Sequence, residues 1–199
     1  MKASDVSLQD LSWLEDLPDT MLELIPQSTV KHTIVSQEPE HVSIWDYAVS
    51  PQGRHFFSVC AEAHSTNYAR LYEYFPGTGY CQKVFSLEDV IVTYDRAIRP
   101  SKIHSSIQFL PDGKLLMATH TTAAAPGHPR WMPFAYYDHL QEGYAGSNIL
   151  ICDPDSGRVE DLGIPVPRES FYGGIYDEKT NSYYLFGYAR GHVYRFDFS

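Results

Sequence analysis

The stretch that decides the fold runs from Lys102 into the turn at Asp153. It contains two readable blocks, KIHSSIQFLPDGKLLMATH at 102–120 and SNILICDPDSG at 147–157. The first block predicts two strands, 107–110 and 114–119, around a Pro-Asp-Gly turn. The second predicts a strand at 148–152, a turn at 153–157 and the start of a fourth strand at 160–162, with an aromatic insertion at 121–146 between the blocks. This order of strands and turns is that of one blade of a β-propeller.

The same unit recurs on both sides of this stretch. Upstream, setting Gly53 on Gly113 also aligns Pro51 with Pro111, at an offset of 60 residues. Downstream, FYGGIYDEKTNSYYLFGYARGHVYRFD at 171–197 aligns at an offset of 68. The three copies, near 42–89, 102–163 and 170–199, predict an all-β fold of β-propeller type with about three blades in a partial ring. A single antiparallel sandwich is the alternative.

Composition restricts the class of protein and its partners. The 199 residues carry a formal net charge of −10, which argues against non-specific nucleic-acid binding. The sequence has no long apolar run, so no membrane partner is expected. The N-terminus lacks an apolar signal core, which predicts a cytoplasmic protein as written, or a secreted or periplasmic one if a leader has been removed. Three cysteines without motif spacing predict free thiols.

Residues 1–27 differ in pattern from the blades at 28–199. Ser7-Leu8-Gln9-Asp10 resembles a capping box, and apolar residues at 8, 11, 13 and 14 predict a short amphipathic helix that ends at Pro18. This N-terminal helical segment either packs on the sheets or serves as a partner-binding tail. Because propellers have about 4–8 blades, a second chain or missing blades are expected to complete the ring.

Polar residues fall where a propeller blade brings strand ends together. In a blade, the start of the first strand and the end of the second lie at the same mouth of the central channel. These positions hold titratable side chains, namely His104 and His120 in the second copy and Tyr172, Tyr188 and Arg190 in the third. We therefore expect these five side chains to gather at one rim of the protein.

These residue types are the ones that β-elimination from a uronate needs. The proton next to the uronate carboxylate is barely acidic, so a cation such as Arg190 must stabilise the charge that develops on the carboxylate. His104 or Tyr172 would act as base and acid, and His120 would contact the carboxylate together with Arg190. The sequence therefore predicts a lyase-like site for a uronate-containing glycan.

The insertion at 121–146 rises from the same face and supplies further candidates. Trp131 would offer an apolar platform to a sugar ring, with Arg130 and Tyr188 as additional substrate-binding residues. The expected partner is an acidic oligosaccharide or polysaccharide.

Four motifs carry a resemblance to a known family: IHSS at 103–106, ATH at 118–120, FYGG at 171–174 and GYARGH at 187–192. They are similar to motifs of propeller-type polysaccharide lyases, the ulvan lyases in particular. The resemblance implies that His104 and His120 correspond to the family's active-site histidines, Tyr172 to its catalytic tyrosine and Arg190 to the arginine that neutralises the carboxylate. Other phrases of the chain look like those of uncharacterised propellers in sugar-degradation loci.

Less specific interpretations compete with an active site. The two histidines could serve only to bond strand ends, the tyrosines only to pack, and Arg190 to pair with Asp177 or Glu178. The rival function is a non-catalytic scaffold that binds a protein or a glycan at the same mouth.

A divalent metal ion, zinc or manganese, is a further possibility for the cofactor. Its ligands would come from side chains near one rim: His104, His120, His128 and His64 or Glu62. The sequence contains no close-spaced ligand pair of the H-x-H or H-E-x-x-H type, so this signal is weak.

Overall fold

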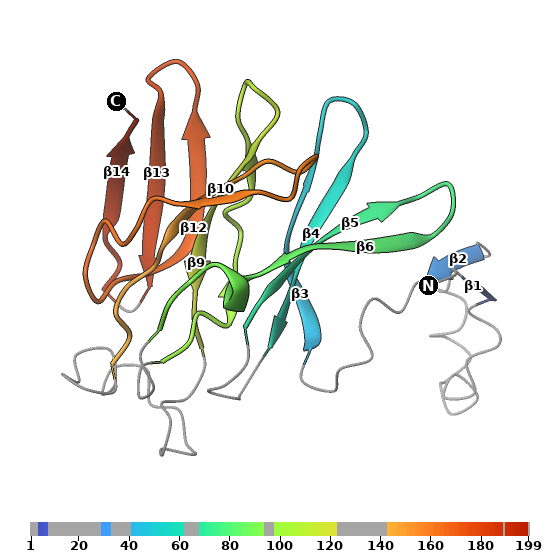
Figure 1. Ribbon diagram of the computed structural model, residues 1–199, viewed down its shortest axis with the longest axis horizontal. Helices are drawn as coiled ribbons and strands as arrows, with labels where there is room; N and C mark the ends of the chain where they lie inside the picture. The colour runs from blue at the N-terminus through green and yellow to red at the C-terminus, as the bar shows by residue number, and fades with distance from the viewer. Residues whose placement is uncertain are drawn as a thin grey trace, which may run out of the picture.

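The computed structural model describes residues 4–7, 29–32, 41–61, 68–93, 98–122, 143–188 and 190–198. The regular structure in these ranges is antiparallel strand apart from one short 3-10 helix, η3 (Leu87–Asp89), so the predicted all-β class is confirmed. Three main sheets occupy 41–86, 102–161 and 170–197 and lie side by side in chain order (Figure 1). A separate pair joins β1 (Ser4–Ser7) to β2 (Thr29–His32).

Each main sheet is built from strands that follow one another in the chain. The first sheet contains β3 (His41–Val49), β4 (His55–Ala61), β5 (Arg70–Phe75) and β6 (Tyr80–Ser86). The second contains β7 (Lys102–Ile103), β8 (Gln108–Phe109), β9 (Leu115–His120), β10 (Ile149–Cys152) and β11 (Val159–Asp161). The third contains β12 (Ser170–Asp177), β13 (Ser182–Tyr188) and β14 (Val193–Asp197).

The two Pro-x-Gly turns predicted from the sequence have the same geometry. Gly53 and Gly113 have φ angles of +80° and +85°, which glycine adopts at little cost because it has no Cβ. The Gly53 N–H donates to the Ser50 carbonyl and the Gly113 N–H to the Leu110 carbonyl, each at 2.9 Å. The offset of 60 residues therefore identified equivalent hairpins of the first two sheets.

The second sheet is buried on both faces because its central strand alternates between two cores. Leu115 and Met117 of β9 pack with the first sheet, in a core that contains Phe56, Leu71 and Phe85. Leu116 and Ala118 face the other way and pack with the third sheet. That second core contains Phe171, Tyr183 and Leu185. All six residues of β9 are buried, so this strand holds the three layers together.

The prediction of a β-propeller is wrong. The three main sheets have four, five and three strands, and none of them closes or takes part in a closed ring in the described part of the chain. The repeat in the sequence reports local hairpins, which any antiparallel sheet contains, whereas closure depends on how sheets pack at long range. The expectation of a second chain or further blades was based on an incomplete ring. Because the described sheets form no such ring, this reason for a partner no longer holds.

The N-terminal helical segment is not supported either. Ser7, expected to cap the helix, is the last residue of β1, and the helical positions 8–18 lie outside the described residues. The three cysteines, Cys60, Cys81 and Cys152, are free and buried, as the sequence predicts. Among the described residues, no helix has the length and apolar character needed to cross a membrane.

Candidate functional site

Strand ends of the second and third sheets meet at one end of the molecule. His104 directly follows β7, and His120 is the last residue of β9, opposite Lys102 in the strand ladder. Tyr172 lies near the start of β12, and Tyr188 ends β13. The two sheets are joined at this end by a 2.7 Å hydrogen bond between the Ser170 hydroxyl and Nδ1 of His120.

The structure brings four of the predicted site residues together as a ring cluster, by which we mean His104, His120, Tyr172 and Tyr188. The ring centroids of His104 and Tyr172 are 3.9 Å apart, and those of His104 and His120 are 5.6 Å apart. His120 also lies 5.3 Å from Tyr172 and 5.2 Å from Tyr188. The two tyrosines stack on one another at 5.7 Å.

Burial keeps both imidazoles of the ring cluster uncharged. His120 is fully buried, and desolvation lowers its pKa to about 3, with further repulsion from His104 whenever that ring is protonated and from Lys102. Desolvation also lowers the pKa of His104, which is 6% exposed, and Lys102 acts in the same direction. The backbone of Tyr172 approaches the His104 ring and favours its charged form, but this contact is not a well-formed hydrogen bond.

The two ring nitrogens of His120 differ in their partners. Nδ1 shares a 2.7 Å hydrogen bond with the Ser170 hydroxyl, which also accepts the Thr121 N–H at 3.3 Å. Nε2 is buried and has no hydrogen-bond partner among the described residues. In the tautomer in which Ser170 donates to Nδ1, the neutral ring carries its proton on Nε2 and offers an N–H donor there.

The first sheet contributes an aromatic ring and the second a cation next to the ring cluster. Trp45 of β3 lies 4.9 Å from the ring of His104, and Nζ of Lys102 lies over the Trp45 ring at 4.0 Å. Lys102 is buried, whereas Trp45 and Tyr172 are 37% and 44% exposed. The site thus presents two exposed aromatic faces above buried, uncharged imidazoles and beside a buried ammonium group.

Arg190 binds groups that precede β12. Its guanidinium donates to the Arg168 carbonyl at 3.0 Å and lies 3.8 Å from the buried carboxylate of Glu169. The same carboxylate accepts the Tyr194 hydroxyl at 2.7 Å, and Tyr194 bonds to His192. One interpretation of the sequence paired Arg190 with Asp177 or Glu178. The structure pairs it with an acidic side chain, but that side chain is Glu169.

Other predicted residues lie outside the described part of the chain. The substrate-binding candidates Arg130 and Trp131 fall there, and so do the metal-ligand candidates Glu62, His64 and His128. Within the described ranges, no group of three or more His, Cys, Asp or Glu side chains is placed to hold a metal ion. Of the metal-ligand candidates, His104 and His120 lie in the described ranges, and no third ligand of these types joins them there.

Sequence reasoning missed Trp45, Lys102 and Ser170 as members of the site. The repeat alignment set Ile44 on His104, but a register shift between Ile44 and Asp46 in β3 brings Trp45 to the histidine instead. Lys102 is not among the site residues that the sequence predicts. The register of the Pro-Asp-Gly hairpin, continued along the strands, would set His104 opposite His120, but the irregular segment between β7 and β8 shifts the pairing by two residues, so that Lys102 lies there instead.

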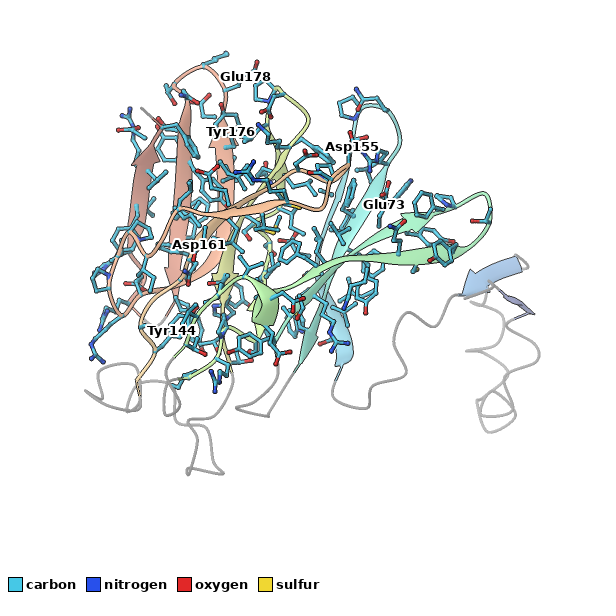
Figure 2. The ribbon with its side chains drawn as sticks, in the orientation of Figure 1. Glu73, Tyr144, Asp155, Asp161, Tyr176 and Glu178 are labelled. Carbon is cyan, nitrogen blue, oxygen red and sulfur yellow. The ribbon has the colours of Figure 1, made fainter. Side chains whose placement is uncertain are left out.

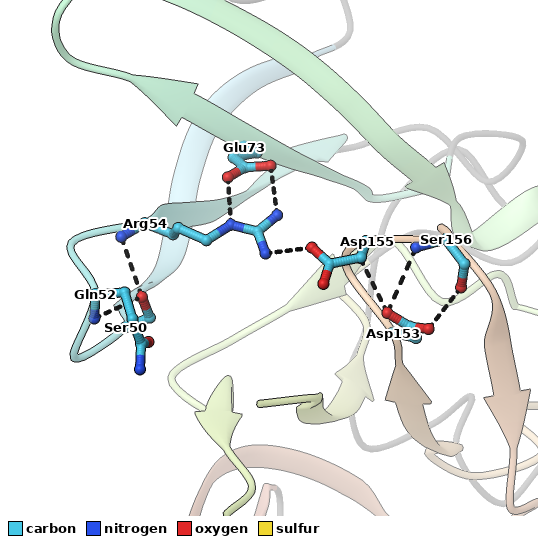
Figure 3. Close-up of polar contacts among 7 residues, drawn as sticks. All are labelled: Ser50, Gln52, Arg54, Glu73, Asp153, Asp155 and Ser156. Carbon is cyan, nitrogen blue, oxygen red and sulfur yellow. Dashed lines mark hydrogen bonds and ion pairs between the residues drawn. The ribbon is translucent and has the colours of Figure 1, made fainter. Parts of the chain in front are cut away.

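The end of the sheets opposite the ring cluster holds a cavity of about 760 Å³ lined by hairpin turns. Asp155 and Glu178 line this cavity, and Figure 2 shows them at the end of the molecule away from Tyr144. Arg54 crosses from the first sheet to the second there. It binds Glu73 through two hydrogen bonds of 2.7 and 3.0 Å and Asp155 at 2.6 Å (Figure 3). Both cations that line this cavity, Arg54 and Lys114, form ion pairs with carboxylates of the protein, which compete with an acidic ligand for them. We therefore place the functional site at the ring cluster.

Comparisons with known proteins do not assign the chain to a family. No family model matches the sequence, and no curated protein matches it. One similar solved structure is the extracellular domain of the putative one component system BT4673 from B. thetaiotaomicron. The TM-score is 0.43 at 8% identity, over 87% of this chain and 19% of that one. The resemblance to propeller-type polysaccharide lyases read from the motifs is overturned by the open sheets and by the absence of a family match.

Proposed function

We propose that the ring cluster binds an acidic saccharide and catalyses β-elimination at its uronate. The observation that supports this proposal is the contact of His104, an imidazole kept uncharged by burial, with the half-exposed ring of Tyr172 at 3.9 Å. A base and an acid side by side are what the reaction needs, because one proton must leave the sugar ring and another must reach the leaving group.

The elimination assigns one task to each residue of the site. His104 removes the proton next to the carboxylate, and the electron pair of that C–H bond forms the new carbon–carbon double bond. The glycosidic C–O bond breaks, and Tyr172 donates its hydroxyl proton to the leaving oxygen. Atoms and charge balance without a cofactor: the C–H and C–O bonds break, the carbon–carbon double bond forms, His104 gains one proton and Tyr172 loses one.

Negative charge that develops on the carboxylate during this step needs a positive partner. Lys102 replaces Arg190 in this task, because its ammonium group lies next to Trp45 and lowers the pKa of both histidines by its charge. His120 supplies a neutral donor beside it in the tautomer in which Ser170 donates to Nδ1, because the ring proton is then on Nε2. His120 is not the base, because a group with a pKa of about 3 accepts protons poorly near neutral pH.

The test uses polygalacturonate, alginate and hyaluronan as substrates and follows the ultraviolet absorbance of the unsaturated uronate product. His104→Ala and Tyr172→Phe are each expected to lower turnover by about 10²–10⁴-fold, the usual contribution of a general acid or base. Tyr80→Phe, which removes an exposed hydroxyl from β6 of the first sheet, is the matched control and is expected to keep full turnover. Wild-type turnover in Tyr172→Phe would refute the assignment of the acid.

Binding without catalysis is the second candidate, and the exposed rings of Trp45 and Tyr172 favour it. Aromatic faces suit the apolar side of a sugar ring whether or not a bond is broken. In that case the same polysaccharides would bind with no unsaturated product, and His104→Ala would weaken binding in a calorimetric titration. Detection of product in the wild-type protein would exclude this alternative.

A further inference from the structure

We propose that Asp46 is the positioning residue that holds His104 against Tyr172. Asp46 acts through the backbone of the connector, by which we mean residues 104–107 between β7 and β8. The role in catalysis rests on the proposed function, whereas the positioning of the ring is a separate property of the molecule.

Asp46 binds the connector through its backbone. One carboxylate oxygen, Oδ2, accepts the N–H of Ser106 in a short hydrogen bond and the N–H of Ile107 at 2.8 Å. Asp46 is 7% exposed and lies in the first sheet, so these bonds cross from one sheet to the next. Charge-assisted bonds of this kind are stronger than neutral ones, and two of them share one acceptor atom.

The shape of the connector explains why it needs such an anchor. Ser105 has a φ of +46°, in the left-handed region that residues with a Cβ rarely adopt. A strand ladder cannot continue through that residue, so the N–H groups after it need acceptors from elsewhere. Asp46 supplies them, and the reversal at Ser105 sets the direction in which His104 leaves β7.

The third sheet holds the same connector from the opposite side. The Gly174 N–H donates to the Ser105 carbonyl at 3.0 Å, and the Tyr183 hydroxyl donates to the Ser106 carbonyl at 2.7 Å. Carbonyl groups of the connector are thus held by the third sheet, and its N–H groups by Asp46. Loss of Asp46 would remove the hold of the first sheet on these N–H groups, and would leave the connector bound to the third sheet and, through the Ser106 hydroxyl, to Ala118 of β9.

The register of β3 gives this arrangement a second consequence. The shift between Ile44 and Asp46 lets two successive residues serve the same histidine. Trp45 contacts the His104 ring at 4.9 Å, and Asp46 holds the backbone that carries that ring. The bulged segment of β3 therefore contacts the ring of His104 through Trp45 and holds the backbone next to His104 through Asp46.

The primary test measures the contact of the His104 and Tyr172 rings directly, by nuclear Overhauser effects in the full-length labelled protein. Asp46→Ala is expected to abolish this cross-peak, and Asp46→Asn, which keeps an acceptor oxygen, is expected to retain it. Val59→Ala is the control, because it removes buried volume from the first sheet without touching the connector. A cross-peak that persists in folded Asp46→Ala would overturn the proposal.

A second measurement decides the matter if Asp46→Ala does not fold. A neutral amide oxygen is a weaker acceptor than a carboxylate, so in Asp46→Asn the amide protons of Ser106 and Ile107 are expected to exchange with solvent severalfold faster than in the wild type. Unchanged exchange at both amides would overturn the proposal.

Turnover separates this inference from the proposed function. With a polysaccharide that the wild type cleaves, Asp46→Ala is expected to lower kcat by about 10²-fold, the cost of misplacing a catalytic group by about 1 Å, with little change in KM. Asp46→Asn is expected to restore most of kcat. If the wild type cleaves no polysaccharide, the proposed function fails, while loss of the ring contact in Asp46→Ala still establishes Asp46 as the positioning residue.

Discussion

Replacement of His120 by asparagine tests whether burial holds this imidazole uncharged. The folded protein has a His120 pKa of about 3, against an ordinary value of 6.5. As the pH falls below 6.5, the unfolded chain binds a proton at this position and the folded chain does not. Stability contributed by the neutral ring is therefore complete above the ordinary pKa and is lost progressively as the pH falls toward 3.

The size of the effect follows from the same two values. At pH 5 the unfolded histidine is almost fully protonated while the folded one remains neutral, so wild-type stability falls by roughly 2 kcal/mol relative to neutral pH through this group alone. Asparagine does not titrate, and its amide reaches the Nδ1 position that bonds to Ser170. We expect His120→Asn to lose about 2 kcal/mol less than the wild type over this range.

The assay is urea denaturation of the full chain at pH 7 and pH 5, followed by tryptophan fluorescence. The cavity left by the smaller side chain lowers the stability of His120→Asn at both pH values, so only the difference between the two is diagnostic. Ser170→Ala is the control, because it keeps the titratable ring and is expected to keep the wild-type pH dependence. Equal pH dependence in His120→Asn and the wild type would refute the reasoning.

Two further predictions concern contacts that join the sheets, with urea denaturation as the measurement for both. Arg54→Met is expected to lower the free energy of unfolding by about 2 kcal/mol, because it leaves the buried carboxylate of Glu73 unpaired, whereas Asp155→Asn, at the exposed end of the same network, is expected to cost less than ~1 kcal/mol. Equal losses would contradict this ranking. Gly174→Ala is expected to cost about 1–3 kcal/mol, because a Cβ there would lie 2.5 Å from the Tyr183 hydroxyl oxygen. Gly77→Ala, with open space around it, is expected to be nearly neutral, and a neutral Gly174→Ala would show that Tyr183 can move.

Local features of the fold could be predicted from the sequence because they depend on nearby residues. Gly53 and Gly113 mark hairpins, since a positive φ is favourable only for glycine at those turns. The closure of the sheets into a ring could not be predicted in the same way. Hairpin patterns are shared by open and closed sheets, and the difference lies in packing between distant segments.

Part of the candidate site could be predicted for the same reason. His104, His120, Tyr172 and Tyr188 were found because equivalent hairpins place equivalent strand ends at one end of the sheets. The contact of Arg190 with the buried carboxylate of Glu169, 3.8 Å away, could not be predicted in this way. A buried acid cannot be recognised in a sequence before its surroundings are known.

The double burial of β9 also determines how the chain divides when it is cut. Leu115 and Met117 belong to one core, and Leu116 and Ala118 belong to the other. A fragment without β9 therefore lacks buried side chains of the core that it keeps. Separate expression of residues 41–93 and 98–198 would leave the first fragment with its apolar face uncovered. We therefore expect the first piece to be unstable alone and to recover its structure when it is mixed with the second piece, which carries β9.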